Sequence, residues 1–314
     1  MKQQNFVLKM VTSLMTVILF VACLSGSAYS GNKDLVLKKY PTLKIGFTTQ
    51  NFAKVFTISL ENTKKLIDYA AEQGFPWIEL RDPNAVLTLA ECKQISDYAR
   101  SKKVEIGYAL GPGLQDDRFF EIFSRGLANA AVFDGPRTIR TGFAGEDFLN
   151  DEKKKAWTLK EFARVVDIAN QAANQAKAHG LTHVLENGRE TVKGDGITSF
   201  GATEVFANVN QNVGLQPDSA NFFTNCRVLT KPEDARVFLE KYAKKIQYVH
   251  LKTSSKEHKA LPVLAESELA FDIVFSILAK NKISYVAIEL DQAGTIEDCY
   301  ANMKKSVEYL MKNF

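Results

Sequence analysis

The chain has 314 residues, of which 46% are hydrophobic and 24% are charged. This composition excludes a disordered tail and a small disulfide-stapled domain, and it matches one large or two ordinary domains with a sizeable core. Lys and Arg number 40 against 36 Asp and Glu, which gives a formal net charge of +4. Because no basic run exceeds the three lysines at 153–155, the charge pattern disfavours nucleic acid as a partner.

Residues 1–30 are predicted to be an export signal. Two lysines precede an apolar stretch over 10–24, and small residues follow it. This order is typical of a secretory signal peptide, and the apolar stretch is shorter than the roughly 20 residues that span a bilayer. A second interpretation stays open, because the residues before Cys23 resemble a lipoprotein cleavage site that would place a lipid anchor there. The sequence thus predicts an exported bacterial protein, either periplasmic or a membrane-anchored lipoprotein, whose catalytic domain covers 31–314.

Three cysteines remain beyond this signal, Cys92, Cys226 and Cys299, and no Cys-x-x-Cys pair occurs. An odd number excludes a complete disulfide framework. Two states stay open, namely three unpaired and partly buried thiols, or one disulfide with one free thiol.

The rest of the chain alternates short β-rich runs with longer amphipathic stretches. Eight strands are predicted, at 43–49, 77–81, 104–110, 138–142, 182–187, 214–221, 246–252 and 285–290. Eight helices are predicted between and after them, at 62–73, 89–102, 119–131, 159–179, 201–210, 231–244, 266–280 and 298–313. Thr88 and Glu91 have the spacing of a capping box, and Gly74 and Gly180 stand where helix ends need a left-handed residue.

This alternation predicts a single (β/α)8 TIM barrel, for which about 250 residues are typical. No Pro/Gly/Ser-rich linker marks a second domain. A doubly wound open sheet is the alternative, but no Gly-x-Gly-x-x-Gly motif follows the first strand to support a dinucleotide site.

Four side chains that bind metals well lie near the ends of four successive predicted strands: Glu186, Asp218, His250 and Glu289. Their spacings of 32, 32 and 39 residues each correspond to one βα unit, so we expect them to meet at one mouth of the barrel. Three carboxylates that close together would repel one another unless a cation neutralises them. Three oxygen donors and one imidazole favour Mn²⁺, with Mg²⁺, Co²⁺ or Zn²⁺ as alternatives. A competing interpretation is that these polar residues only solvate the rim of a barrel. It explains any one of them taken alone, but it explains four residues at matching positions on successive strands less well.

The segments around these residues resemble the metal-binding segments of the xylose isomerase-like sugar phosphate isomerase/epimerase superfamily: LENG at 185–188, PDSAN at 217–221, VHLKT at 249–253 and AIEL at 287–290. The resemblance covers roughly 43–314. It implies metal-ligand roles for Glu186, Asp218, His250 and Glu289, and an acid/base pair formed by Glu186 and Glu289.

Two positions depart from that pattern. Asn221 stands where many relatives have His, and Thr253 stands where many have Asp. Asn221 can donate a hydrogen bond to a sugar hydroxyl but cannot carry a proton. The substrate or the reaction is therefore expected to differ from those of the best-known epimerases.

Further side chains are candidates for substrate binding. Glu79 and Arg81 share one face of the second predicted strand, where they form either a buried ion pair or a substrate contact. Arg140 either holds a substrate oxygen or serves as the charge partner of a metal ligand. Lys252 and Lys256 either stabilise negative charge on a substrate oxygen or are solvated.

Two more predictions concern side chains on the strands. We expect Tyr108 to form an apolar wall against which a sugar ring sits. His183 alternates away from Glu186, so we expect it to pack under a helix, and Asn187 is expected to orient Glu186.

These residues predict a metal-dependent isomerase or epimerase of a small-molecule carbohydrate, which removes the proton alpha to a carbonyl and passes through an ene-diolate. A lyase or dehydratase that eliminates a beta substituent from a keto-sugar or 3-keto-glycoside uses the same enolate and is the chemical alternative. A non-catalytic sugar-binding protein is the alternative of another class. DNA endonucleases of the same superfamily build multi-zinc clusters from many histidines, and the four His of this chain disfavour that function. The oligomeric state is not predicted.

Overall fold

A computed structural model describes six stretches of the chain: 35–142, 159–187, 202–224, 231–254, 261–290 and 292–314. All of them belong to one compact unit, Asp34–Phe314. The expected signal segment at 1–30, Cys226 and Lys256 lie outside the described residues, so the predictions about them stay predictions.

Eight parallel strands form one sheet: β1 (Lys44–Thr48), β2 (Trp77–Arg81), β3 (Glu105–Gly113), β4 (Thr138–Gly142), β5 (Thr182–Glu186), β6 (Val213–Gln216), β7 (Tyr248–Leu251) and β8 (Tyr285–Ile288). Their order in the sheet is β6-β5-β4-β3-β2-β1-β8-β7. Two isolated bridges, Leu215 to Ile246 and Asp218 to His250, join the ends of this order. The sheet thereby closes into a barrel in which the strands follow one another in chain order.

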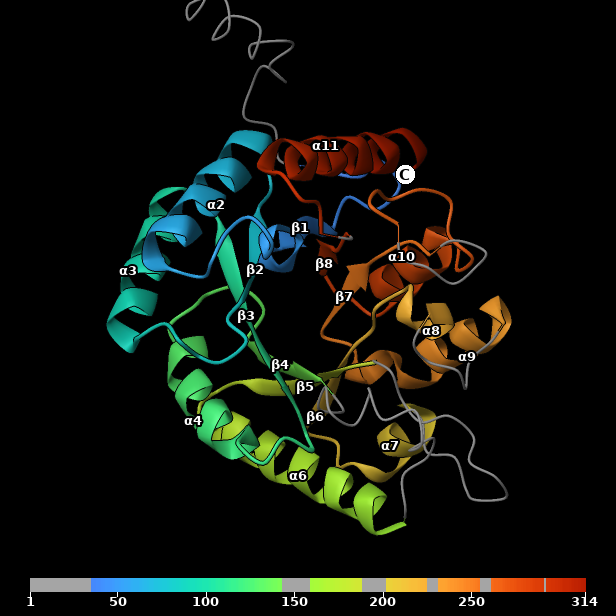
Figure 1. The fold of residues 1–314 in the computed structure, drawn as a ribbon. Helices are drawn as coiled ribbons and strands as arrows, with labels where there is room; N and C mark the ends of the chain where they lie inside the picture. Colours follow the sequence, from blue (N-terminus) through green and yellow to red (C-terminus); the bar gives the residue numbers. More distant parts are fainter. Residues whose placement is uncertain (1–34, 143–158, 188–201, 225–230, 255–260, 291) are drawn as a thin grey trace, which may run out of the picture. The chain divides into compact units, whose positions relative to one another are not determined.

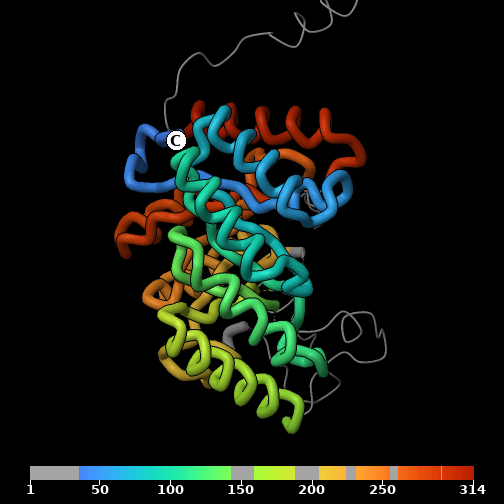
Figure 2. The backbone as a smooth tube through the Cα atoms, turned by 90° about the vertical axis from the view of Figure 1, so that its left-hand side faces the viewer, coloured from blue at the N-terminus to red at the C-terminus, as the bar shows by residue number. Residues whose placement is uncertain are grey.

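Helices lie outside the strands of this barrel (Figure 1). They are α2 (Leu60–Gln73), α3 (Leu89–Ser101), α4 (Phe119–Ala130), α6 (Leu159–Ala178), α7 (Ala202–Asn208), α8 (Asn221–Thr224), α9 (Pro232–Tyr242), α10 (Phe271–Lys280) and α11 (Ile296–Asn313), with short 3-10 turns η1 (Thr49–Phe52) and η2 (Ala243–Lys245). Figure 2 shows α2, α3, α4 and α6 following one another along one side of the barrel.

The structure confirms the predicted TIM barrel, including every predicted strand and helix. The largest difference concerns the predicted strand 214–221, which ends as β6 at Gln216. Pro217 has no N–H to donate to the sheet, and the chain then turns into the short helix α8. The predicted helix 266–280 begins later, as α10 at Phe271.

Local sequence signals set several helix ends. Thr88 and Glu91 form the predicted capping box at the start of α3, with the Glu91 carboxylate accepting from Thr88 N at 2.8 Å. Gly74 ends α2 with a φ of 78°, and Gly180 follows α6 with a φ of 68°. Both are left-handed conformations that glycine adopts without steric cost.

The apolar core has two parts. The larger one fills the space between strands and helices, and a smaller one lies among the strands themselves, formed by Trp77, Val184, Tyr248 and Ala287. Trp77 packs its ring edge-on against Tyr248, and its Nε1–H donates to Lys44 O at 2.9 Å. Since Trp77 begins β2, this small cluster closes the barrel interior beneath the carboxyl ends of the strands.

Two of the three cysteines, Cys92 and Cys299, are buried and unpaired. Among the described helices, none combines the length and the apolar character needed to cross a bilayer.

Candidate metal centre

The four predicted ligands meet at the carboxyl ends of neighbouring strands. Glu186 ends β5, Asp218 follows β6, His250 lies in β7 and Glu289 follows β8. Each offers one ligand atom, and these four atoms all lie within 4.8 Å of one another. We call these four side chains the donor cluster. Three of them are buried and Glu186 is half-buried, so the donor cluster is mostly withdrawn from water.

Backbone contacts between strands fix the donor cluster. Asp218 pairs with His250 across the closing seam of the barrel. His250 N donates to Pro217 O at 2.8 Å, and Glu289 N donates to Leu251 O at 2.9 Å. Because the ligands are tied to the backbone of a neighbouring strand, the rigid sheet sets their relative positions.

The imidazole of His250 lies between two carboxylates. Its Nε2 is 3.0 Å from Oε2 of Glu79, and its Nδ1 is 2.6 Å from Oε2 of Glu289. Burial alone would lower the pKa of His250, but the two carboxylates outweigh burial and raise that pKa to about 10. With Nε2 bonded to Glu79, Nδ1 is the ring atom that faces the donor cluster. A carboxylate that fixes the far nitrogen of a ligating histidine is a common feature of metal sites.

Glu79 lies fully buried beneath His250. Besides the imidazole it accepts hydrogen bonds from the Tyr248 hydroxyl at 2.6 Å and from Thr48 Oγ1 at 2.8 Å, and Arg140 lies 3.7 Å away. Burial favours the neutral acid, but His250 and Arg140 hold the pKa of Glu79 well below its ordinary value. Glu79 therefore positions His250 and has no exposed surface for a substrate. The predicted contact between Glu79 and a substrate is therefore wrong. The alternative of a buried ion pair agrees with the structure, but the partners of Glu79 are His250 and Arg140 and not Arg81.

One buried ligand atom of the donor cluster, Oδ2 of Asp218, lacks a hydrogen-bond partner among the described residues. The other oxygen of Asp218 accepts from the backbone N–H groups of Ala220 and Asn221, at 2.8 and 3.0 Å. Burial, together with the charges of Glu289 and Glu186, raises the pKa of Asp218 to about 7 against the opposing effect of Lys252. An unsatisfied buried carboxylate oxygen is costly, and this one points to a missing electropositive partner.

Two cationic side chains hold the glutamates of the donor cluster. The Lys252 ammonium lies 2.7 Å from Oε1 of Glu289, and the Arg140 guanidinium lies 2.5 Å from Oε2 of Glu186. Burial opposes ionisation of Glu289, but Lys252 and His250 keep its pKa well below the ordinary value. Arg140 thus lies where the charge-partner alternative placed it, and Lys252 lies beside the donor cluster.

Two asparagines support the same region. Asn187 exchanges hydrogen bonds with the backbone of Asp218, accepting from its N–H at 2.6 Å and donating to its carbonyl at 3.2 Å. Asn221 donates to the carbonyl of Asn187 at 2.9 Å, and its amide nitrogen lies 3.4 Å from Oε1 of Glu186. Asn221 therefore borders the donor cluster. The side chain of Asn187, the residue after Glu186, anchors the backbone of Asp218.

Tyr108 lies elsewhere, and the prediction that it lines the site is corrected. Its hydroxyl donates to Oδ2 of Asp82 at 2.9 Å, and its ring stacks on Phe133 on the helix side of the sheet. His183 packs under α4 as expected, with Nε2 2.9 Å from Thr141 Oγ1 and its ring beside Phe123. Alternation along β3 and β5 turns both rings away from the barrel interior.

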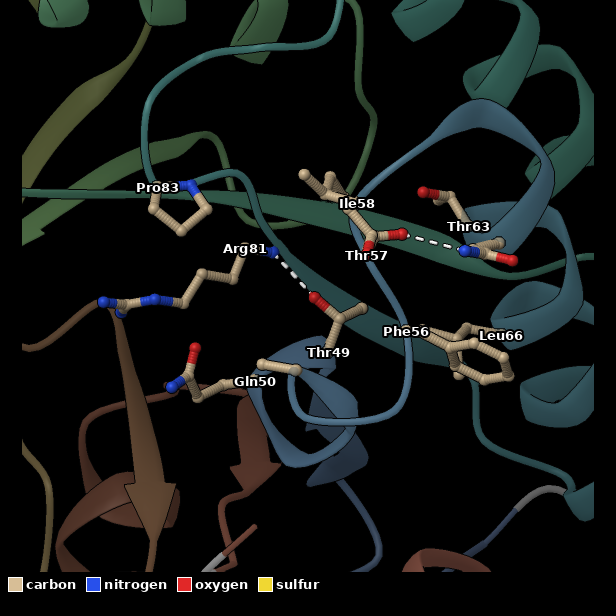
Figure 3. A pocket seen from close by; sticks show the side chains of 11 residues that line it. Thr49, Gln50, Phe56, Thr57, Ile58, Thr63, Leu66, Arg81 and Pro83 are labelled. Carbon is tan, nitrogen blue, oxygen red and sulfur yellow. Dashed lines mark hydrogen bonds between the residues drawn. The ribbon is translucent and has the colours of Figure 1, made fainter. Parts of the chain in front are cut away.

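Sequence reasoning missed a pocket at the carboxyl ends of β1 and β2 (Figure 3). It has a volume of about 250 Å³, and Thr49, Gln50, Phe56 and Arg81 are among the residues that line it. It also missed Tyr248 as a partner of Glu79. The only sequence signal for Tyr248 is its place two residues before His250, on the same face of β7.

The donor set fits a divalent cation. Three carboxylates and one imidazole converge within 4.8 Å, and Oδ2 of Asp218 has no hydrogen-bond partner among the described residues. Oxygen ligands with one nitrogen suit Mn²⁺ and Mg²⁺ better than a soft metal. The four side chains would hold the ion, and Glu79 would orient the only imidazole among them.

Replacing Glu79 by Gln is expected to weaken metal binding about 10- to 100-fold, because the His250 ring loses the carboxylate that fixes its orientation. Titration calorimetry with Mn²⁺ measures the change. Tyr248→Phe, which removes one hydrogen bond to Glu79, is expected to have a smaller effect in the same direction, and Glu308→Gln on the outer face of α11 serves as the matched control. Unchanged Mn²⁺ affinity in a folded Glu79→Gln protein would contradict this role.

Comparisons with known proteins agree with the fold. The sequence profile of the xylose isomerase-like TIM barrel family matches residues 67–311. A xylose isomerase-like TIM barrel protein from Mycobacterium smegmatis, in complex with magnesium, superposes with a TM-score of 0.63 at 17% identity, over 86% of this chain and 97% of that one. D-psicose 3-epimerase from Clostridium cellulolyticum, with D-tagatose, gives a TM-score of 0.61 at 15% identity, over 85% and 99%.

A sugar phosphate isomerase/epimerase from Parabacteroides distasonis gives a TM-score of 0.56 at 16% identity, over 85% of this chain and 97% of that one. A search of the curated proteins finds no match. The family profile covers most of the barrel, from α2 to α11. The chain therefore belongs to the xylose isomerase-like TIM barrel family.

Proposed function

We propose that this chain is a metal-dependent sugar isomerase or epimerase that removes the proton alpha to a carbonyl of a small carbohydrate and passes through an ene-diolate. The observation that carries the proposal is the donor cluster, in which four ligand atoms lie within 4.8 Å of one another and the buried Oδ2 of Asp218 lacks a hydrogen-bond partner among the described residues. Family membership supports it, and so do the epimerases among the structural relatives. Mn²⁺ is the favoured ion, with Mg²⁺, Co²⁺ or Zn²⁺ as alternatives.

The chemistry needs strong stabilisation of negative charge. The proton alpha to a ketone is far too weakly acidic to be removed by an ordinary carboxylate with a pKa near 4.3. A divalent ion in the donor cluster would supply several kcal/mol of charge stabilisation to the developing oxyanion. Lys252, whose ammonium lies 2.7 Å from Glu289 and 3.9 Å from Asp218, adds a fixed positive charge beside the same position.

Glu186 and Glu289 are the proposed proton carriers. One oxygen of each is held by a cation, Arg140 for Glu186 and Lys252 for Glu289. The second oxygen of each faces the His250 ring, at 3.9 Å for Glu186 and 2.6 Å for Glu289. Two carboxylates at one small site can remove a proton from carbon and return one to the opposite face of that carbon, as epimerisation requires, or to the neighbouring carbon, as isomerisation requires.

Metal removal is expected to abolish the reaction. We expect the Mn²⁺-loaded protein to exchange the alpha proton of a keto-sugar for solvent deuterium, which NMR in D₂O detects. A chelator should stop the exchange, and added Mn²⁺ should restore it. Full exchange by metal-free protein would remove the proposed mechanism. Formation of an unsaturated product in place of simple exchange would identify the lyase alternative.

Glu289→Gln is expected to lower the exchange rate about 10²- to 10⁴-fold, because the amide keeps an oxygen but loses the proton-carrying function. The rate is measured at saturating Mn²⁺, and the metal content is measured by elemental analysis. Glu308→Gln, an exposed exchange of the same kind, is the control. A Glu289→Gln protein that binds Mn²⁺ and keeps the wild-type exchange rate would exclude Glu289 as a proton carrier.

We also propose that the protein is exported, as the order of residues within 1–30 indicates. In a bacterium that expresses the gene, mass spectrometry is expected to find a mature chain that begins at Gly31, or one that begins at a lipid-modified Cys23. In the second case, Cys23→Ser should move the protein out of the membrane fraction. An uncleaved chain in the cytoplasm would contradict export.

A further inference from the structure

Arg81 is a cation without an anion among the described residues. It ends β2 at the barrel mouth, two residues beyond Glu79 on the same strand face. No described carboxylate lies within 4.0 Å of its guanidinium, and its buried Nε has no hydrogen-bond partner in the described part of the chain. The neighbouring acid is already engaged, because Asp82 accepts from the N–H groups of Val86 and Leu87 and from the Tyr108 hydroxyl.

A second arginine makes this position less favourable. In the register of the sheet, Arg81 on β2 and Arg140 on β4 flank the same residue of β3, Ala109. Arg140 forms ion pairs with both nearby glutamates, Glu79 and Glu186. Burial and the charge of Arg140 together lower the pKa of Arg81. Arg81 therefore carries a positive charge next to a like charge, without the compensation that Arg140 has.

Among the described side chains that face the donor cluster, the charges leave a positive excess once a divalent ion is bound. Four carboxylates face three cationic side chains and the two charges of the ion, with the imidazole neutral. The carboxylates are Glu79, Glu186, Asp218 and Glu289, and the cations are Arg81, Arg140 and Lys252. One positive charge remains, and Arg81 is the cation among these that has no partner. A partly buried excess charge calls for an anion in the bound ligand.

A pocket lies beside Arg81. The pocket of about 250 Å³ between η1 and α2 has Arg81 in its wall. Figure 3 shows the Arg81 side chain extending past Gln50, away from Phe56 and Leu66. Arg81 N donates to Thr49 Oγ1 at 2.9 Å, which fixes the strand end against η1. The side-chain amide of Gln50 also has no hydrogen-bond partner among the described residues, so a second polar group is free beside the guanidinium.

We propose that Arg81 binds a carboxylate of the substrate, so that the substrate class is an acidic keto-sugar. The inference rests on the proposed function, which puts the reacting carbonyl at the donor cluster, at the ends of β5 to β8. Arg81 lies at the end of β2, on another side of the mouth. A planar guanidinium fork matches one carboxylate through two parallel hydrogen bonds. A phosphate dianion fits less well, because it carries two negative charges and the described mouth has a single unpaired cation to neutralise them.

The first test is equilibrium binding of two sugars that cannot react. D-gluconate and D-sorbitol differ at one terminal carbon, which is a carboxylate in the first and a hydroxymethyl group in the second. Calorimetry on the Mn²⁺-loaded protein is expected to give gluconate a Kd about 10- to 100-fold lower. Arg81→Gln should remove most of this preference, and Arg81→Lys should keep part of it, because lysine retains the charge but loses the fork.

Controls separate Arg81 from other sources of anion affinity. Arg236→Gln, which removes an exposed arginine paired with Glu233 and Glu240 on α9, should keep the full preference. If gluconate binds the ion alone, its preference survives Arg81→Gln, and the proposal is overturned. Sorbitol 6-phosphate is the third ligand. Tighter binding of the phosphate through Arg81 would overturn the carboxylate assignment.

The second test separates this inference from the proposed function. Deuterium exchange is compared for D-fructose and D-fructuronate, the same ketose with a terminal carboxylate. A kcat/KM about 10- to 100-fold higher for the acid supports the inference. Exchange of fructose with no preference for the acid overturns the inference and leaves the proposed function standing. A gluconate preference that depends on Arg81, without exchange of any keto-sugar, supports anion binding by Arg81 and overturns the proposed function.

Discussion

Four carboxylates at one end of the barrel, three buried and one half-buried, are the constraint on which the rest of the site depends. A carboxylate that leaves water loses solvation worth several kcal/mol, and neighbouring carboxylates also repel one another. Each of three cationic groups lies between two of them: Arg140 between Glu79 and Glu186, Lys252 between Asp218 and Glu289, and His250 between Glu79 and Glu289. Loss of one cation would therefore weaken the compensation of two carboxylates at once, so the site is organised as one network rather than as separate pairs.

The fold and the meeting of the four side chains of the donor cluster were predictable because both depend on local patterns. A strand or helix is visible in its own periodicity, and one ligand per βα unit recurs at the spacing of the barrel itself. Side-chain partners across the barrel were not predictable. Glu79 on β2 and His250 on β7 are 171 residues apart, and only the closed sheet brings Nε2 to the carboxylate. For the same reason the sequence could not decide whether Glu79 pairs with Arg81 or with Arg140.

Tyr108 shows a second limit of the sequence. The alternation along β3 separates two faces without saying which one faces inward. The structure turns the small residues, Gly107 and Ala109, into the barrel, where a Cβ on Gly107 would touch the Trp77 ring at 3.4 Å. The large side chains of β3, including Tyr108, are left to pack against the helices. Which face of β3 points inward is thus a property of the closed barrel and is not visible in the alternation of β3 itself.

The two departures from the family pattern both remove a titratable group from the mouth. Asn221 is held by the carbonyl of Asn187, and Thr253 is buried with its hydroxyl accepting from Ala265 N at 3.2 Å. Neither side chain can carry a proton at these positions, so among the described residues the proton transfers fall to the carboxylates of the donor cluster. Compared with an Asp, Thr253 also brings one negative charge fewer. That difference adds to the positive excess among the described residues, in the direction that the proposed acidic substrate requires.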